Sequence, residues 1–444
     1  MADQHLSANN TSDIERPPIT EDEGENHHQS FDGHLMLRVP EVLRVNKRNL
    51  DDHYAPKIVS IGPYYHGLPE LRKAEELKHE VLELSVSRSS KQLLYRRISE
   101  VIDQIRNCYV GVSRDRYGDE ELAEMMLLDA SFALCLIDSK TRDGENGELV
   151  HRNLGIAAMP FVFNDLILFE NQIPLMVISL LYELTRGAAS NLIYELRRFI
   201  AFVNNWPIEK IPVEGERLPF HLLDAFYQLF VKDVDDAEEE PSNRRQRRTW
   251  RRENPNKFWD YNRQSRSVTD LKAKGIHFKP SSYCFKDIKF KSYTFYGQLQ
   301  LPVLSFDANS RLILVQSIAY EMSLGRDINF IVLCYVNFMK SLIVKSEDVK
   351  ELREKKILIS DLDSDEQIVE AIKGIDTHSF GTDSIFYEVK NQIAKHCSSE
   401  AKTWIAELIH TYFRSPWTSI ALFAATFLLC LTFLQTYYTI NPRK

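Results

Sequence analysis

The stretch DEELAEMMLLDASFALCLI, residues 119–137, decides the fold of this chain. Its apolar side chains recur at helical spacing and form a face wide enough for deep burial: Leu122, Met125, Met126, Phe132, Ala133 and Leu136. We therefore predict a buried helix over these residues, at the core of a multi-helix globular domain.

Helical periodicity recurs along most of the chain, so we predict a predominantly α protein of the α+β type. The predicted helices cover residues 68–86, 91–110, 174–187, 191–204, 219–232, 268–273, 311–342, 346–355, 364–373 and 387–411. Residues 57–61 read as a short strand, and residues 283–306 alternate apolar and polar side chains. The alternation predicts a small antiparallel β element with a turn near Tyr293.

Charge and composition divide the chain of 444 residues. The first thirty residues hold seven acids and one arginine, which accounts for −6 of the formal net charge of −8. They are poor in large apolar residues, so we expect residues 1–34 to be a disordered acidic leader. We expect one domain over residues 35–413, an anchor over 414–440 and a short tail over 441–444.

Residues 233–253 interrupt the domain with six acids followed by six arginines. Segregated charge with almost no apolar residue favours a solvated loop. The arginine run also resembles a nuclear-localisation or nucleic-acid patch. We favour the loop and expect no nucleic-acid partner, because the adjacent acids cancel the field of the arginines and the rest of the chain is not basic.

The stretch WTSIALFAATFLLCLTFLQTYY, residues 417–438, contains 22 residues without a charge. About 20 apolar residues suffice to cross a bilayer as a helix. We predict a single C-terminal transmembrane helix with the bilayer as a partner, although a buried core helix would show the same composition. The residues assigned to the span are Trp417, Ile420, Phe423, Phe427, Leu431, Leu434 and Tyr438.

The N-terminus lacks the basic start and apolar run of a secretory signal. We therefore expect the bulk of the chain in the cytosol, held at the plasma membrane or an endomembrane. Six cysteines lie far apart, without a CxxC pair or a tight Cys/His cluster. They are expected to be reduced and mostly buried, and no metal or other cofactor is predicted.

The common signatures of nucleotide-binding loops, nucleophile elbows and zinc helices are missing from the sequence. Three clusters could carry chemistry, and each also has a structural interpretation. The first is His66, which can be a hydrogen-bonded histidine in a tight turn. The second is Asp165 with Glu170 and Asn171, a possible carboxylate pair, in which Asn171 or Glu170 can instead cap the helix near Pro174. The third is Glu121, Glu124 and Asp129, which are expected on the outer face of an amphipathic helix. We favour the structural interpretation for each cluster and assign no catalytic residue.

Several motifs in a fixed order resemble the plant family DUF247, a domain of unknown function. They include VSIGPYYHG (residues 59–67), ELAEMMLLD (121–129), LFENQIP (168–174) and LKAKGIHFK (271–279). The resemblance covers about residues 35–440. Tyr65 and Ala130 depart from it, since the family commonly has His and Gly at these positions.

The resemblance implies a mostly helical domain with a C-terminal transmembrane helix and no established activity or cofactor. Some grass relatives are implicated in self-incompatibility, which is a recognition function. We therefore expect a membrane-anchored module that binds an unknown protein partner. The alternative is a membrane-tethered enzyme, for example a hydrolase, that uses His66 or the pair Asp165 and Glu170.

Overall fold

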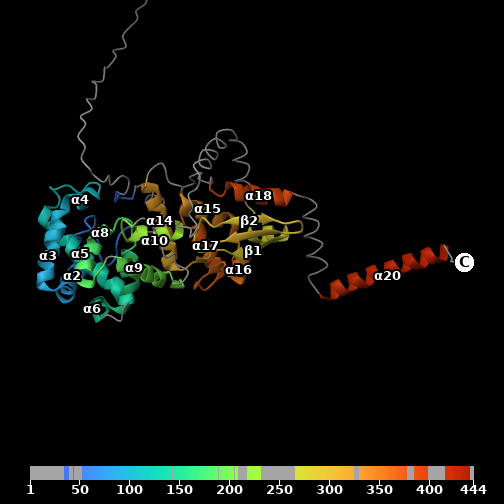
Figure 1. Ribbon diagram of the computed structural model, residues 1–444, viewed down its shortest axis with the longest axis horizontal. Helices are drawn as coiled ribbons and strands as arrows, with labels where there is room; N and C mark the ends of the chain where they lie inside the picture. Colours follow the sequence, from blue (N-terminus) through green and yellow to red (C-terminus); the bar gives the residue numbers. More distant parts are fainter. Residues whose placement is uncertain are drawn as a thin grey trace, which may run out of the picture. The chain divides into compact units, whose positions relative to one another are not determined.

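Helix α5 (Asp119–Thr141) lies at the centre of the first half of the chain in the computed structural model (Figure 1). Leu122, Met126 and Phe132 on this helix are fully buried. Helix α5 packs mainly against α2 (Arg72–Ser85), α3 (Arg88–Glu100), α6 (Glu145–Leu154), α8 (Leu175–Arg186) and α9 (Ser190–Val203). The predicted deep burial is confirmed, because the wide apolar face of α5 is covered by these neighbouring helices.

The structure describes residues 35–39, 44, 53–141, 145–188, 190–204, 206–208, 218–231, 266–324, 330–377, 385–398 and 416–440. By its contacts the chain divides after Gly33 into a leader and one larger unit, His34–Lys444. The predicted acidic leader, the charged loop at 233–253 and the tail at 441–444 all lie outside the described residues.

Shorter elements connect the helices around α5. They are η1 (Pro69–Leu71), α4 (Ile102–Asn107), η2 (Ile156–Ala158) and α7 (Met159–Asp165). The second half of the chain contributes α10 (Leu222–Val231), α13 (Val268–Ala273), α14 (Ala308–Ser323), α15 (Ile331–Leu342), α16 (Ser346–Glu354), α17 (Asp365–Lys373) and α18 (Tyr387–Ser398). The predominantly helical fold is therefore confirmed.

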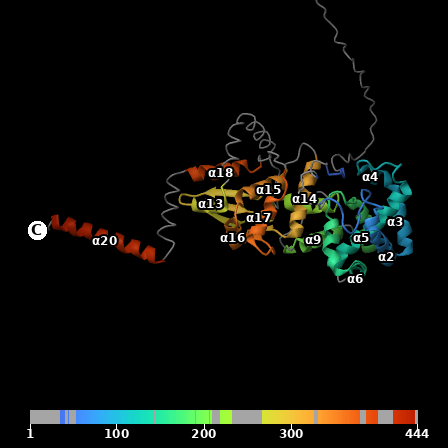
Figure 2. The same cartoon turned by 180° about the vertical axis from the view of Figure 1, so that it is seen from behind.

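A three-stranded sheet lies among the later helices. Its strands are β1 (Ile276–Pro280), β2 (Lys289–Ser292) and β3 (Gly297–Leu301), in the order β1-β3-β2. Helix α18 packs on β2, while α13 lies beside β1 and α16 (Figures 1 and 2). The predicted turn near Tyr293 is confirmed by the bond from its N–H to the carbonyl of Tyr296, 2.8 Å long.

The prediction of a purely antiparallel element is wrong. Strand β2 is antiparallel to β3, but β1 runs parallel to β3. A parallel pair needs a longer connection than a hairpin, and the chain between β1 and β3 supplies it. A second, two-stranded parallel sheet pairs β4 (Leu304–Ser305) with β5 (Leu358–Ile359).

Two predicted helices are interrupted. The pattern at 91–110 breaks at Val101, which has φ −112° and ψ 15° between α3 and α4. The pattern at 311–342 is divided between α14 and α15, and Phe330 takes φ 43° directly before α15. Apolar spacing continues through both breaks, so periodicity alone could not locate them.

Residues 57–61 belong to neither sheet: Lys57 and Ile58 lie in a bend, and residues 59–61 have no regular secondary structure. The predicted strand is therefore wrong as a sheet element. Val59, Ser60 and Ile61 are buried, so their backbone groups need partners within the protein. Side chains from distant parts of the chain provide these partners instead of a neighbouring strand.

Residues 416–440 form helix α20 (Pro416–Ile440). In the described part of the chain, no helix combines the length and apolar character that crossing a membrane requires. The transmembrane span expected over residues 417–438 is therefore not confirmed.

Candidate functional site

Asp165 at the end of α7 binds the backbone of the irregular segment 57–61. Its carboxylate accepts three N–H groups, from Lys57 at 2.9 Å, Ile58 at 2.7 Å and Val59 at 2.9 Å. Asp165 is 108 residues away from Lys57 in the chain. It therefore does for this segment what a neighbouring strand does in a sheet.

Asn171 continues the same arrangement. Its side-chain oxygen accepts the N–H of Ile61 at 2.7 Å, and its amide group donates to the carbonyl of Val59 at 3.0 Å. The amide group also donates to the carbonyl of Asp165 at 2.9 Å, within its own loop. Both polar ends of this fully buried side chain are therefore satisfied.

Glu170 holds the N-terminal part of the domain. Its carboxylate accepts the N–H of Val39 and a guanidinium N–H of Arg44, each at 2.5 Å. It also accepts the hydroxyl of Tyr65 at 2.6 Å. Tyr65 is one of the positions that departs from the family pattern, and here its hydroxyl reaches a buried carboxylate.

Lys78 and Asp129 form a buried ion pair on the other side of the segment, 2.6 Å apart. The ammonium of Lys78 also donates to the carbonyl of Ser60 at 2.6 Å and to Glu75 at 2.7 Å. Asp129 accepts the N–H of Gly62 at 2.7 Å. Helices α2 and α5 are therefore joined through the backbone of this one segment.

We call this group the polar centre, defined by Lys78, Asp129, Asp165, Glu170 and Asn171. Three of the motifs that carry the family resemblance meet here, at residues 59–67, 121–129 and 168–174. The sequence analysis treated them as separate clusters. Their contacts with the segment 57–62 bring them together.

The predicted role of Asn171 and Glu170 as helix caps is wrong. Helix α8 begins after Pro174, and no side chain caps it by a hydrogen bond. Both residues bind distant backbone or side-chain groups instead. A helix cap bonds to a backbone N–H two or three residues away, whereas these two bonds join residues more than a hundred positions apart.

The other predicted residues divide between the polar centre and the surface. Glu121 and Glu124 are exposed on α5, as expected for an amphipathic helix, while Asp129 on the same helix is buried. His66 lies in a turn, as predicted, but its Nδ1 has no hydrogen-bond partner among the described residues. The nearest carboxylate is that of Glu75, 3.8 Å from Nδ1.

Sequence reasoning missed Lys78. A signal was present, because Lys78 occupies the buried stripe of α2 together with Ala74 and Leu82, four residues to either side. A lysine on such a stripe needs a buried carboxylate as a partner. Asp129 supplies it.

Burial dominates the electrostatics of the polar centre. It raises the pKa of Asp165 to about 6, although the three accepted N–H groups lower it. Burial also raises the pKa of Asp129, against the nearby ammonium of Lys78. The carboxylates are therefore held by their partners at a cost in solvation.

The geometry of the polar centre fits a structural role. A general base must present a lone pair to a substrate. The carboxylate oxygens of Asp165 and Glu170 already accept backbone, guanidinium or hydroxyl donors, and both residues are 2% exposed. The pair proposed for a hydrolase is therefore engaged in holding the chain.

Glu321 is a buried carboxyl outside the polar centre, and it joins three helices. It lies on α14 and accepts the N–H groups of Val332 at 2.8 Å and Leu333 at 3.0 Å, in the first turn of α15. The hydroxyl of Tyr227 on α10 donates to it at 3.1 Å. Burial raises the pKa of Glu321 to about 7.

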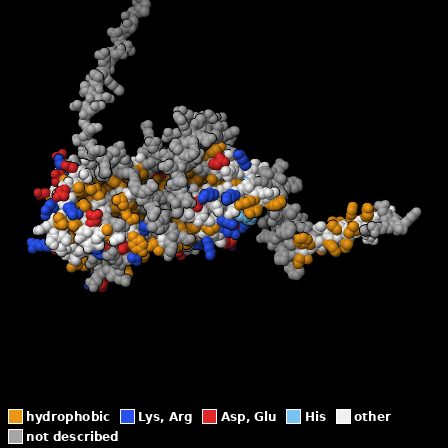
Figure 3. Space-filling model, in the orientation of Figure 1, with side chains coloured by type: hydrophobic (Ala, Val, Ile, Leu, Met, Phe, Trp, Pro, Cys, Tyr) orange, Lys and Arg blue, Asp and Glu red, His pale blue; other side chains and the backbone are white. Residues whose placement is uncertain are grey.

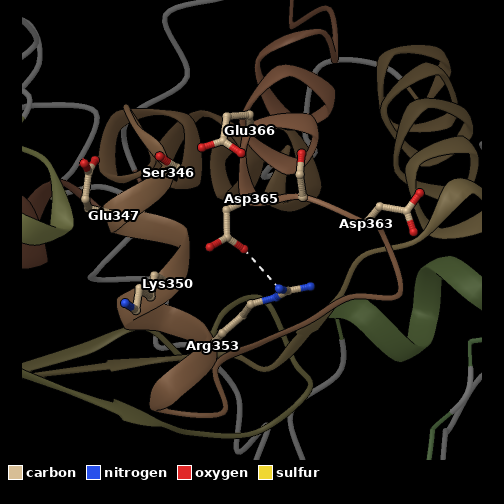
Figure 4. A pocket seen from close by; sticks show the side chains of 8 residues that line it. Ser346, Glu347, Lys350, Arg353, Asp363, Asp365 and Glu366 are labelled. Atoms are coloured by element: carbon tan, nitrogen blue, oxygen red, sulfur yellow. Dashed lines mark hydrogen bonds and ion pairs between the residues drawn. The ribbon is translucent and has the colours of Figure 1, made fainter.

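A polar pocket of about 330 Å³ lies between α16 and α17 (Figure 4). Its lining is charged, and Arg353 pairs with Asp365 across 3.0 Å. The remaining lining side chains are Ser346, Glu347, Lys350, Asp363, Ser364 and Glu366. None of the residues singled out from the sequence lines this pocket.

The cysteines agree with the expectation of reduced, mostly buried thiols. All six are free, and only Cys430 is exposed. Burial raises the pKa values of Cys108 and Cys135 to about 12, which keeps both thiols protonated. Among the described residues, no three His, Cys, Asp or Glu side chains are grouped to hold a metal ion.

Comparison with known proteins places this chain in a family. The model of DUF247, described as a plant protein of unknown function, matches residues 36–431. The UPF0481 protein At3g47200 of Arabidopsis thaliana is 26% identical over 430 residues, which cover 90% of this chain and 85% of the relative. The putative UPF0481 protein At3g02645 of the same plant is 24% identical, with coverages of 90% and 89%. No solved structure matches.

Gly62→Ala is expected to destabilise the protein more than Gly67→Ala. Both glycines have a left-handed backbone, with φ of 83° and 80°. An added Cβ at Gly62 would lie 2.4 Å from the carbonyl oxygen of Gln172, whereas at Gly67 it would meet nothing within 4 Å. Gly67→Ala should cost about 1 kcal/mol, as backbone strain alone does, and Gly62→Ala several times as much.

Urea unfolding of the full-length variants measures both losses. The difference between them isolates the collision, because the backbone strain is matched. Equal losses would show that the 57–62 segment moves away from Gln172 without cost and is not held by the polar centre.

Glu321→Gln is expected to flatten the pH dependence of stability. The folded protein holds the proton of Glu321 up to a pKa of about 7, above the ordinary 4.5. Its contribution is therefore complete below about pH 4.5 and is lost as the pH rises through about 7, which amounts to about 3 kcal/mol. The uncharged amide removes this part of the slope.

The free energy of unfolding, measured at about pH 5 and about pH 8, gives the slope for each variant. Glu124→Gln, an exposed position on α5, is the control and should follow the wild type. Parallel slopes for the wild type and Glu321→Gln would contradict the assignment of a raised pKa to this carboxyl.

Proposed function

The chain belongs to the DUF247 family of plant proteins, and on that premise we propose that it is a membrane-associated recognition module. In this proposal α20 holds the protein at a membrane, and the helical domain presents a surface to a protein partner. The observation that carries the proposal is the exposure of apolar side chains all around α20.

Figure 3 shows hydrophobic side chains along the length of α20. Ile420, Phe423 and Phe427 are between 59% and 67% exposed. Leu429 and Phe433, on the opposite side of the helix, are 71% and 73% exposed. Apolar area on this scale marks a binding surface, and a lipid bilayer accepts apolar side chains on every face of a helix.

The hydroxyls of α20 suit an apolar environment. Thr432 donates to the carbonyl of Leu428 and Thr436 to that of Thr432, each at 2.8 Å. Thr439 donates to the carbonyl of Gln435 at 2.7 Å. These side chains therefore need no hydrogen bond from water.

Three further features support recognition over catalysis and a cytosolic side for the domain. The carboxylates of the polar centre are bound to structural partners. Large apolar side chains are exposed on the domain, including Ile156 at 79% and Leu84 at 68%. Five buried free cysteines are compatible with a reducing compartment.

Fractionation of the full-length protein from plant cells tests the membrane part. Wild type should pellet with membranes through a high-salt wash. The double variant Phe427→Asp with Leu431→Asp should lower the ratio of pelleted to soluble protein at least about tenfold, because each carboxylate costs a few kcal/mol among lipid chains. The control is Leu84→Asp with Ile156→Asp, which makes the same change at exposed positions of the domain and should stay in the pellet. Wild type recovered without membranes would overturn this part.

Proximity labelling in plant cells tests the recognition part. The full-length protein should label specific proteins above a control that carries residues 416–440 alone. Partners are expected because the exposed apolar side chains of the domain form protein contacts more readily than they stay in water. A profile identical to that of the control would mean that the domain recognises no protein.

A further inference from the structure

The sheet β1-β3-β2 buries one face and exposes the other. Phe278, Leu299 and Phe290 lie side by side on the buried face, one from each strand. Helix α18 covers the β2 side of this face, where the ring of His396 packs on Phe290 with centroids 5.6 Å apart. The opposite face has the alternate residues of each strand.

That opposite face carries basic side chains. Strand register forms two cross-strand rows, each with an amide between two basic residues: Lys279–Gln300–Lys289 and His277–Gln298–Lys291. The four basic residues are exposed, and the two glutamines are half-buried. One ammonium, that of Lys289, lies 2.6 Å from the carboxylate of Asp287. We call these six residues the cationic face.

An exposed aromatic turn continues the cationic face at the end of the β2–β3 hairpin. Phe295 is 59% exposed, Tyr293 41% and Tyr296 40%. The rings of Tyr293 and Tyr296 stack with centroids 4.7 Å apart, and Tyr296 also packs against His277 at 5.4 Å. The turn is therefore ordered before any partner binds, although it leaves three aromatic rings in contact with water.

We propose that the cationic face and this turn dock on the surface of a membrane that contains anionic phospholipids. The lysines attract the negative headgroups, with about 1 kcal/mol for each lysine near the surface. Tyrosine and phenylalanine rings suit the boundary between headgroups and acyl chains. Figure 3 shows cationic and hydrophobic side chains beside one another over the strands.

The position of the sheet in the chain favours a membrane over an acidic protein as the partner. Helix α18 packs on the sheet and ends at Ser398, and α20 begins at Pro416. The intervening 17 residues can span at most about 60 Å. This argument rests on the proposed function, in which α20 is bound to the membrane.

Lysines on edge strands also prevent edge-to-edge pairing of sheets. Strands β1 and β2 are the edges of this sheet, so the two roles have to be separated. Replacement of lysine by glutamate separates them. It keeps a charge on the edge but reverses the attraction to anionic lipid.

The test uses the full-length protein with vesicles of phosphatidylcholine alone and of phosphatidylcholine with phosphatidylserine. Flotation measures capture, and hydrogen exchange measures the amides of residues 293–296. We expect both kinds of vesicle to capture the protein. Only the vesicles that contain phosphatidylserine should slow hydrogen exchange at the turn, by roughly tenfold. Lys279→Glu with Lys291→Glu, and separately Phe295→Ser, should abolish this protection without loss of capture.

The matched control is Lys73→Glu with Arg96→Glu, which reverses two exposed charges on α2 and α3 and should protect the turn as the wild type does. Unchanged exchange in α5 shows that each variant is folded. Capture with equal exchange on both lipids, or protection that survives the glutamates, would overturn the docking face alone.

Capture by neither vesicle would overturn both the docking face and the tether. Capture by anionic vesicles only, lost in Lys279→Glu with Lys291→Glu, would support the docking face and overturn the tether through α20. An acidic partner would instead give capture without lipid-dependent protection, which also counts against the docking face.

Discussion

The fold depends on hydrogen bonds to the backbone N–H groups of one irregular segment, residues 57–62, in which residues 59–62 are buried without a neighbouring strand. Each buried N–H that lacks a partner costs free energy comparable to a lost hydrogen bond. Asp165, Asn171 and Asp129 accept five N–H groups from this segment. These three side chains come from α5, α7 and the loop before α8, so the packing of those elements is fixed by where the segment runs.

This constraint explains why a lysine is buried at the polar centre. Asp129 accepts the N–H of Gly62, and Lys78 donates to the carbonyl of Ser60. Each ion compensates the other at 2.6 Å. Removal of one partner would leave an uncompensated charge in the core, which is far more costly than the pair. The perturbed carboxyls of the polar centre therefore have structural partners.

The exposed face of the sheet and helix α20 differ in the chemistry of their side chains. The sheet is small, yet its register places a lysine or histidine on both sides of each central glutamine. The apolar helix α20 has no such alternation and exposes hydrophobic side chains on opposite sides. One surface suits charged headgroups and the other suits acyl chains, so the two proposed contacts with a membrane use different chemistry.

The sequence by itself determined the helical class, the buried helix at 119–137, the helix at 268–273 and the turn near Tyr293, because local spacing of apolar residues and turn residues reports local structure. It also singled out Asp165, Glu170, Asn171 and Asp129, but in two separate clusters and without Lys78. Only the tertiary structure decided what they bind. Their long-range partners lie between 51 and 131 residues away, and no local period encodes a bond across such a distance. The same reason explains the parallel pairing of β1 with β3 and the missing strand at 57–61, where side chains replaced a sheet.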